Sequence, residues 1–282
     1  MDMLRFEYND DDFQYISNLM QECAGINLTE SKRELVYGRL AKRLRALNLV
    51  SFAQYCQILK EGDKQERIHC VNQLTTNVTS FFRENHHFDY LANTALPKLL
   101  AEKTNNKTNR LRIWSAGCSS GEEAYSIAIT LRENELLTSG KWDAKILATD
   151  LDSNILDKAR KGIYKIEQLE NISEQRRIRW FQQGRGDKQG LANVTGELKD
   201  MISFKQLNLS NVSWPMHGPF DVIFCRNVVI YFDKEMKKKL INRFADLLDD
   251  GGYLFVGHSE SLFGISDRFT AVGHTMHMKA AE

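Results

Sequence analysis

Apolar residues recur along the first part of the chain at the three- and four-residue spacing of amphipathic helices. The repeat runs from about residue 11 to residue 80 and is clearest at Phe13, Ile16, Leu19 and Met20, and again at Leu35, Leu40, Leu44 and Leu47. This pattern predicts an all-α N-terminal domain that, with its linker, extends over residues 1–85.

From residue 86 onward, short apolar runs alternate with helical stretches, which is typical of a Rossmann-like α/β domain with a mainly parallel sheet. The run that begins at Leu111 leads into a glycine-rich turn and a helix, the opening unit of a doubly wound sheet. Further strands are predicted at AKILATD, ISFKQLNL, FDVIFC and GYLFV, with a C-terminal antiparallel pair from FTAVGHTMHMKA. We therefore expect one α/β domain over residues 86–282.

The α/β rhythm is interrupted between residues 163 and 205. A polar helical stretch is followed there by the turn GRGDKQG and by the segment LANVTGELKDMISFKQLNL. Alternating apolar residues broken by turn residues predict two or three short antiparallel strands. We expect a small inserted β-subdomain, of the kind that supplies specificity above the ligand end of a sheet.

The turn after the first strand has unusual chemistry for a phosphate-binding loop. Gly117 and Gly121 allow close approach of the backbone to a ligand. Glu122 and Glu123 stand at the helix start, where they would repel a pyrophosphate, and neither a Walker lysine nor G-x-G-x-x-G is present. An acidic turn suits a cationic cofactor, and S-adenosylmethionine carries both an ammonium and a sulfonium. Alternatively, the glycines only make a tight turn and the glutamates satisfy the helix dipole.

Two other stretches carry candidate ligand-binding residues. Asp150 ends the second predicted strand, where such folds bind ribose hydroxyls; it is alternatively the cap of the helix SNILDKARKG, and the two roles can coexist. Asn77, Thr79 and Arg83 lie in the polar and aromatic stretch TTNVTSFFRENHHFDYL and would converge on a ligand if that stretch crosses the cleft. The alternative is a helix start with Thr79 as its cap.

Composition excludes several classes of protein. Lys and Arg number 38 against 37 Asp and Glu, and a net charge of +1 argues against a general nucleic-acid binder. The five cysteines are scattered without disulfide or metal spacing, the adjacent His86 and His87 make a poor metal pair, and no metal is expected. Because no apolar run approaches about 18 residues and the N-terminus is acidic, we expect a cytoplasmic protein without membrane insertion.

The second helical stretch concentrates positive charge in this neutral chain. Its cations are Lys32, Arg33, Arg39, Lys42, Arg43 and Arg45, against a single Glu34. They form either a solvated face or a dock for an acidic partner.

Five ordered blocks, NVTSFFRE, SAGCSSGEE, ATDLD, LNL and CRNVVIYF, closely resemble the chemotaxis receptor glutamate methyltransferase (CheR) family, and the resemblance covers nearly the whole chain. It implies a class I fold and transfer of a methyl group from S-adenosyl-L-methionine to glutamates of chemoreceptors, leaving S-adenosyl-L-homocysteine. The implied cofactor-binding positions are Asn77, Thr79, Arg83, Gly117, Glu123, Asp150, Asn208, Leu209, Arg226 and Asn227. The implied catalytic residues are Arg83 and Tyr231, the latter near the transferring methyl group.

Elementary chemistry assigns roles to several of these residues. A glutamate carboxylate, with a pKa of about 4.3, is ionised at neutral pH, so methyl transfer to it needs orientation and not a general base. Arg83 is expected to hold the substrate carboxylate, and Asp150 the ribose. Glu123 would favour the cationic cofactor over its neutral thioether product. Leu209 is expected to pack on the adenine, with Asn208 at its edge.

The resemblance also implies partners. The basic helix would dock on the helical, glutamate-rich part of a receptor, and in some relatives the β-subdomain grips the receptor's C-terminal tail. A monomer that binds no nucleic acid is expected. A DNA or RNA methyltransferase is a rival, but its usual D/N-P-P-Y/F loop is replaced here by CRNVVIYF. A second rival is a non-catalytic relative, but Arg83, Asp150 and Tyr231 are all present, which argues against loss of activity. The acidic glycine loop disfavours a dehydrogenase.

Overall fold

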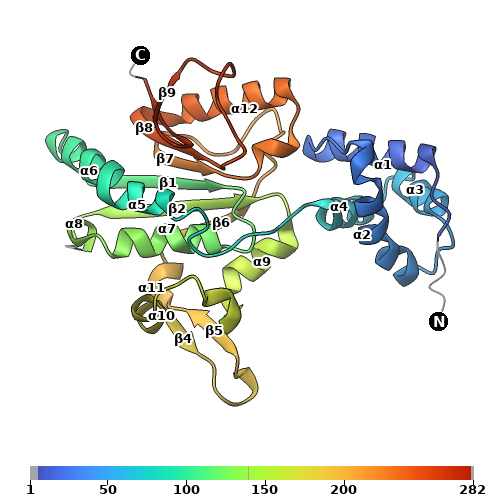
Figure 1. Ribbon diagram of the computed structural model, residues 1–282, viewed down its shortest axis with the longest axis horizontal. Coiled ribbons are helices and arrows are strands. Elements are labelled where there is room, and N and C mark those ends of the chain that lie inside the picture. The colour runs from blue at the N-terminus through green and yellow to red at the C-terminus, as the bar shows by residue number, and fades with distance from the viewer. Residues whose placement is uncertain (1–5, 139, 281–282) are drawn as a thin grey trace. The chain divides into compact units, whose positions relative to one another are not determined.

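The computed structural model describes residues 6–138 and 140–280. The chain forms two compact units. One runs to Thr76 and includes Tyr231–Met236, and the other comprises Asn77–Ile230 and the chain from Lys237 onward (Figure 1).

The first unit is helical, as the apolar spacing predicts. Its elements are α1 (Asp10–Ala24), the 3-10 turn η1 (Glu30–Lys32), α2 (Arg33–Ala46), α3 (Phe52–Lys60) and α4 (Lys64–Leu74). Asn9 and Asp12 form a capping box at the start of α1, and Gly25, with φ of 69°, ends the helix in the left-handed conformation. Ile16, Leu40 and Phe52 are fully buried, so this unit has its own apolar core.

The second unit is built on a seven-stranded sheet with the order β6-β2-β1-β7-β8-β10-β9. The strands are β1 (Arg110–Ala116), β2 (Asp143–Asp150), β6 (Ile202–Gln206), β7 (Phe220–Cys225), β8 (Leu248–Val256), β9 (Phe269–Gly273) and β10 (Met276–Lys279). The first five strands in this order are parallel, and β10 is antiparallel to both of its neighbours. The predicted C-terminal antiparallel pair is confirmed.

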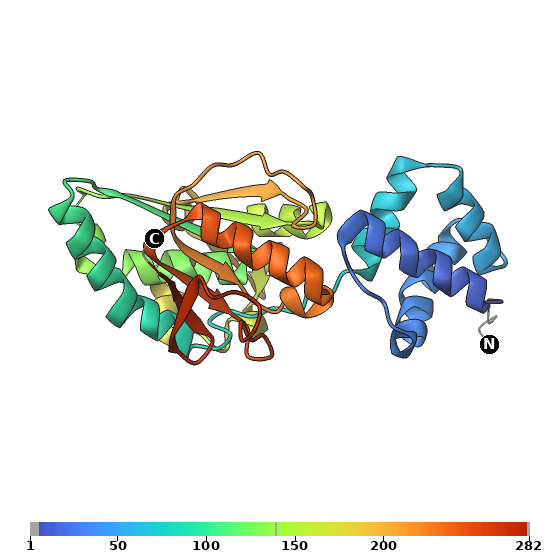
Figure 2. The same cartoon turned by 90° about the horizontal axis from the view of Figure 1, so that it is seen from above.

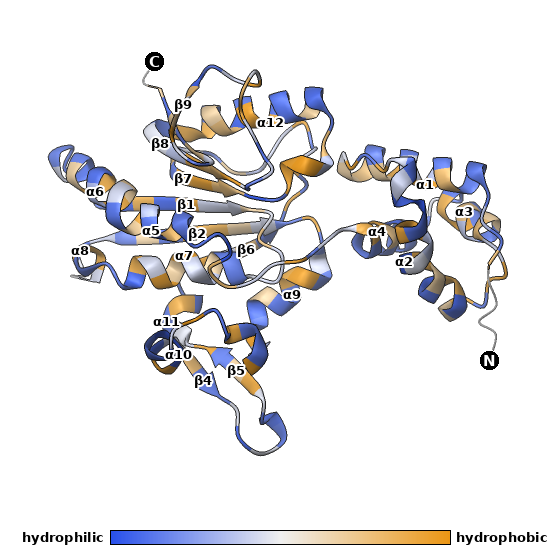
Figure 3. Cartoon of the chain, in the orientation of Figure 1, coloured by the Kyte–Doolittle hydropathy of each residue, from blue (hydrophilic) through white to orange (hydrophobic). Residues whose placement is uncertain are grey.

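Helices cover both faces of this sheet. They are α5 (His86–Tyr90), the π-helical turn η2 (Leu91–Ala95), α6 (Leu96–Asn105), α7 (Glu122–Arg132), α8 (Glu135–Thr138), α9 (Ser153–Lys161) and α12 (Lys234–Leu247). On one face, Phe88 of α5 stacks on Phe224 of β7 with ring centroids 5.9 Å apart. On the other face, Trp114 of β1 meets Phe244 of α12 edge to face, with ring centroids 5.3 Å apart. Figure 2 shows α12, in orange, lying over the strands of the sheet. β7 is buried at all six positions and is apolar at each of them except Asp221, so it is drawn mostly in orange in Figure 3.

A second, three-stranded antiparallel sheet lies beside the main one (Figure 1). Its strands, in the order β3-β5-β4, are β3 (Ile163–Lys165), β4 (Phe181–Gln183) and β5 (Leu191–Val194). Short helical elements connect them: η3 (Ile166–Leu169), α10 (Glu174–Trp180), η4 (Gly186–Lys188) and α11 (Gly196–Lys199). The predicted subdomain, residues 163–205, is too long at its C-terminal end. Ile202–Gln206 forms β6 of the main sheet, where it pairs with β2, because Ile202 and Phe204 pack against the main core.

The strand order reverses between β1 and β7, since the chain leaves β1 for β2 on one side while β7 pairs with the other side. Open α/β sheets bind ligands at the carboxyl ends of the strands at such a switch point. The carboxyl ends of β1, β2 and β7 are therefore where this sheet is expected to bind its ligand. No described helix combines the length and the apolar character that a membrane crossing requires. None of the five cysteines forms a disulfide.

Candidate active site

The glycine loop between β1 and α7 lies against the end of β2. The backbone N–H groups of Gly117 and Cys118 both donate to the carbonyl of Thr149, at 2.8 and 2.9 Å. Gly117 has φ of 93°, and a Cβ there would lie far inside van der Waals contact with the Val228 side chain. Glycine is therefore required at this position both by its conformation and by the space available.

Asp150 is the last residue of β2, and its carboxylate faces this loop. Its two oxygens accept hydrogen bonds from the backbone N–H of Ser119 (2.8 Å) and of Asp152 (3.0 Å). Burial raises the pKa of Asp150 to about 6, against the opposing effect of these two bonds. The alternative that Asp150 caps α9 is wrong: Asp152 is the cap, and accepts from the N–H groups of Asn154 and Ile155.

The stretch before α5 runs along the same loop. The Asn77 amide donates to Asp152 at 2.9 Å, and the Ser119 hydroxyl donates to the Asn77 carbonyl at 3.0 Å. Phe81, which is fully buried, packs edge to face on Tyr164 and anchors the stretch. Thr79 is half-buried and does not cap a helix, because α5 begins only at His86.

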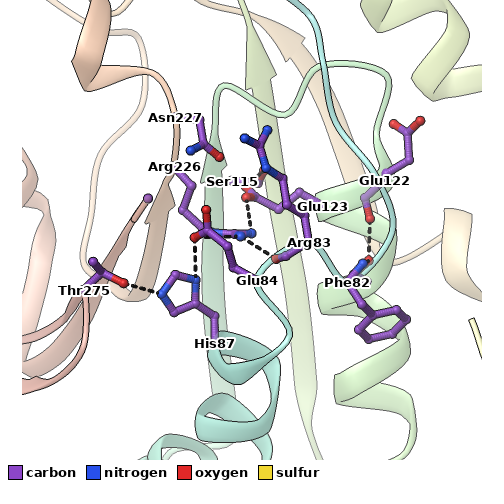
Figure 4. A network of polar contacts seen from close by, with 12 residues as sticks. Phe82, Arg83, Glu84, His87, Ser115, Glu122, Glu123, Arg226, Asn227 and Thr275 are labelled. Carbon is purple, nitrogen blue, oxygen red and sulfur yellow. Dashed lines mark hydrogen bonds and ion pairs between the residues drawn. The ribbon is translucent and has the colours of Figure 1, made fainter. Parts of the chain in front are cut away.

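A buried charge cluster joins this stretch to β7 and α7 (Figure 4). The Arg226 guanidinium, directly after β7, pairs with Glu84 and Glu123, each at 3.1 Å, and donates to the carbonyl of Arg83. Glu123 also accepts from the Ser115 hydroxyl at 2.7 Å. Burial raises the pKa of Glu123 despite Arg226 and Ser115, whereas for Glu84 the attraction of Arg226 outweighs burial and the pKa lies below its usual range.

The backbone around this cluster is strained. Four residues other than glycine have positive φ there: Phe82 (51°), Glu84 (56°), Ser119 (48°) and Asn227 (59°). L-residues rarely adopt this conformation, at a cost of about 1–3 kcal/mol each, and such residues concentrate at functional sites. The strain is therefore a second feature, independent of charge, that marks this region as the site.

The other expected residues occupy neighbouring positions. Asn208 and Leu209 follow β6, whose end is joined to β2 by a bond from the Leu207 N–H to the Asp150 carbonyl at 2.9 Å. Leu209 is buried. Asn227 donates its N–H to Glu260 at 2.8 Å.

Two expected residues stand apart from this cluster in their contacts. The Arg83 side chain donates to the Val78 carbonyl at 2.9 Å. Tyr231 ends the 3-10 turn η5 (Val229–Tyr231) and belongs to the helical unit, where its carbonyl accepts from the Asn27 N–H. The role of Tyr231 at the site stays a prediction from the sequence.

Sequence reasoning missed several residues of the site. Glu84 directly follows Arg83 in a quoted block, yet nothing local indicated its pairing with Arg226. Glu260 accepts the N–H groups of Gly257, Asn227 and Ile230, and no pattern pointed to it. The capping role of Asp152, as distinct from the residue itself, was detectable, because Asp followed by Ser and Asn before an apolar helical repeat is a typical N-cap signal.

The donor set fits a cationic cofactor. Glu84 and Glu123 share one guanidinium, so their cluster has one net negative charge when both are ionised. Asp150 accepts from the loop at Ser119, Asp152 accepts from Asn77, and residues 117–121 contain no basic side chain. A sulfonium and ammonium compound suits this setting, whereas a pyrophosphate does not.

Comparison with known proteins agrees with this reading of the site. Residues 77–278 match the CheR methyltransferase SAM-binding domain, and residues 11–75 match the CheR methyltransferase all-alpha domain. The chemotaxis protein methyltransferase of Escherichia coli (strain K12) is 42% identical over 274 residues, which is 97% of this chain and 92% of that protein. The chemotaxis protein methyltransferase 2 of Pseudomonas aeruginosa is 43% identical over 277 residues, 98% of this chain and 95% of that one.

A solved rRNA methylase from Streptococcus thermophilus overlays with a TM-score of 0.34 and 12% identity, over 61% of this chain and 89% of that one; so distant a likeness adds nothing to the assignment. The sheet and the SAM-binding domain match define a class I S-adenosylmethionine-dependent methyltransferase. The chain belongs to the CheR methyltransferase family.

Proposed function

We propose that this chain transfers a methyl group from S-adenosyl-L-methionine to side-chain carboxylates of specific glutamates in chemoreceptors, for adaptation in chemotaxis. The products are glutamate methyl esters and S-adenosyl-L-homocysteine. The observation that carries the proposal is the family match over nearly the whole chain, to relatives named as chemotaxis methyltransferases. The acidic site at the switch point supports it independently of the match.

The cofactor supplies an electrophilic methyl group on a sulfonium, and the chain's own residues hold and orient it. Asp150 would accept the ribose hydroxyls, and its burial at the end of β2 supports this role. Glu123 and the net negative cluster around Arg226 would favour a cation over the neutral product. Leu209 would pack on the adenine beside Asn208. Asn77 and Thr79, with Gly117 and Asn227, complete the proposed pocket.

The acceptor needs no general base, because a glutamate side chain is already ionised at neutral pH. Arg83 would hold the acceptor carboxylate by a charge-assisted hydrogen bond. Its backbone carbonyl accepts a hydrogen bond from the Arg226 guanidinium, which helps to fix its position. When the neutral ester forms, this attraction is lost, and product release is favoured. Tyr231 would shape the space around the transferred methyl group.

We also propose that a receptor docks on the basic helix α2. Contacts within the helical unit reduce the number of its cations that are available to a partner. Arg39 donates to the carbonyls of Leu74 and Thr75, and Arg43 pairs with Glu66. Arg33 pairs with Asp10 at 2.5 Å. The exposed cations left for a glutamate-rich partner are Lys32, Lys42 and Arg45. We further propose that the small antiparallel sheet binds a receptor C-terminal tail, and that the protein acts as a cytoplasmic monomer.

The test uses radiolabelled S-adenosyl-L-methionine, the purified chain, and membranes that carry chemoreceptors from the same source. Label released from the receptor as methanol by mild base identifies a methyl ester. The Arg83→Ala variant should transfer the methyl group at least tenfold more slowly than the unaltered chain, since it lacks the charged hydrogen bond to the acceptor. Arg110→Ala, at the opposite end of β1, is the matched control and should transfer normally.

A protein that binds the cofactor but labels no receptor would overturn the enzymatic proposal. A cofactor-sensing relative that signals through a partner would then be the better description. Label that is stable to base would point instead to an amine or amide acceptor.

A further inference from the structure

Three histidines from distant parts of the chain meet at one place on the α/β unit. His86 is the first residue of α5, His258 follows β8 by two residues, and His274 lies in the turn between β9 and β10. One ring nitrogen of each lies within 4.8 Å of the others. The ring centroids are 5.0 Å apart for His86 and His258, 5.0 Å for His258 and His274, and 6.0 Å for His86 and His274.

From this cluster we propose that His86, His258 and His274 bind one divalent transition-metal ion of the zinc class. The site adjoins the charge cluster, because the backbone N–H of His258 donates to Glu84 at 3.5 Å, but none of the three histidines belongs to the proposed methyl-transfer machinery. Three imidazoles without a thiolate or carboxylate ligand suit Zn²⁺, Cu²⁺ or Ni²⁺ and not Mg²⁺ or Ca²⁺. Three protein ligands leave a fourth tetrahedral position for water.

A buried nitrogen of His86 supports a metal over simple contacts between tilted rings. The Nε2 of His86 is buried and has no hydrogen-bond partner. A buried polar atom without a partner is costly, and a metal ion at the cluster would satisfy it.

The backbones of the ligands are already held in place. His87, next to His86, shares a 2.8 Å hydrogen bond with Thr275, next to His274 (Figure 4). The Thr275 carbonyl accepts from the Val256 N–H at 3.0 Å, two residues before His258. These contacts fix the three segments relative to one another, so the metal adds a bridge to an arrangement that the fold has already made.

The adjustment that binding requires is small. With Zn–N distances of about 2.0–2.1 Å, tetrahedral geometry places ligand nitrogens about 3.4 Å apart. The nitrogens, which lie within 4.8 Å of one another, must therefore close by at most about 1.4 Å, and side-chain rotation supplies this because His258 and His274 are exposed. Metal binding then ties the start of α5 to the C-terminal strands.

The test is a titration of the untagged, full-length chain with Co²⁺ and Zn²⁺ after removal of metals by a chelator. We expect one equivalent of Co²⁺ to give the visible absorption of a tetrahedral site, and Zn²⁺ to displace it. His258→Ala and His274→Ala should each weaken Zn²⁺ binding at least tenfold. His217→Ala, which removes an exposed histidine elsewhere in this unit, should bind as the unaltered chain does.

Unfolding supplies a second readout. Zn²⁺ should raise the unfolding midpoint of the unaltered chain and of His217→Ala, but not that of His274→Ala, whose midpoint without metal should be unchanged. Absent binding, or binding that all variants retain equally, would overturn the proposal and leave the three rings as a group of tilted side-chain contacts. Because no methyl donor is present, this result is independent of the test of methyl transfer.

Discussion

Replacing Arg226 by methionine tests whether the buried charge cluster is held together by charge compensation. The substitution keeps most of the apolar stem but removes the guanidinium that pairs with Glu84 and Glu123. The side chains of these glutamates are only 8% and 10% exposed, so water cannot replace the lost cation. Breaking a buried pair in this way costs about 3–5 kcal/mol, a large part of the total stability of a domain.

The assay is unfolding by heat and by denaturant. Since 1 kcal/mol corresponds to about 2–4 °C for domains of about 150–250 residues, the midpoint should fall by about 6–20 °C. Arg160→Met is the matched control, because Arg160 pairs with Asp157 on an exposed helix surface with side chains 45% and 65% exposed. The Arg160→Met variant should lose less than about 1 kcal/mol of unfolding free energy.

The dependence on pH distinguishes charge from packing. Without Arg226, the pKa values of Glu84 and Glu123 rise in the folded state, and each glutamate costs stability once the pH exceeds its unfolded value. Lowering the pH from about 7.5 to about 5 increases their protonation and should shrink the difference in stability between the variant and the unaltered chain. Adding Glu84→Gln to Arg226→Met should likewise recover part of the loss. A loss below about 1 kcal/mol, or one that does not vary with pH, would refute charge compensation.

Two further predictions concern the strand ends. Burial raises the pKa of Asp150 to about 6, so the group is protonated more readily in the folded chain; its contribution to stability declines as the pH rises from its usual value to about 6 and is constant above. If the ionised form holds the ribose, the Kd for S-adenosyl-L-homocysteine measured calorimetrically should rise toward tenfold per pH unit below about 6; Asp150→Asn should remove that dependence, and an unchanged profile would exclude the role. Gly117→Ala combines a positive φ with a clash on Val228, whereas Gly186→Ala has a positive φ and open space around it. Denaturant unfolding should therefore show a loss of about 1 kcal/mol at Gly186 and about 1–3 kcal/mol more at Gly117, and equal losses would show that the loop yields to accommodate the Cβ.

The local part of the structure was predictable because local patterns decide it. The strand 144–150 ends at Asp150 in the structure, as its apolar run and the following polar residues predict. The glycine turn and the helix after β1 follow from Gly117, Gly121 and the apolar repeat of α7. Helical and strand periodicity depends on near neighbours in the chain, and is therefore readable without tertiary information.

The predictions failed where one local pattern was compatible with two structural assignments. Asp150 and Asp152 are both plausible caps for α9, and only the hydrogen bonds decide for Asp152. The alternating segment 191–209 divides between two sheets, because Leu191–Val194 pairs with β3 and β4 while Ile202–Gln206 pairs with β2. Strand alternation shows that a segment is extended, but it does not identify the neighbouring strand.

The sequence by itself determined the element order, the acidic glycine loop and the membership of a methyltransferase family. Tertiary structure alone decided that Glu84, Glu123 and Arg226 share one buried cluster, and that His86, His258 and His274 meet. Residues 86 and 87 look like a poor metal pair because adjacent side chains point apart, while the true neighbours of His86 are about 170 and 190 residues away in the chain. Such contacts depend on strand order and on which helix covers which face, and no local pattern records either of them.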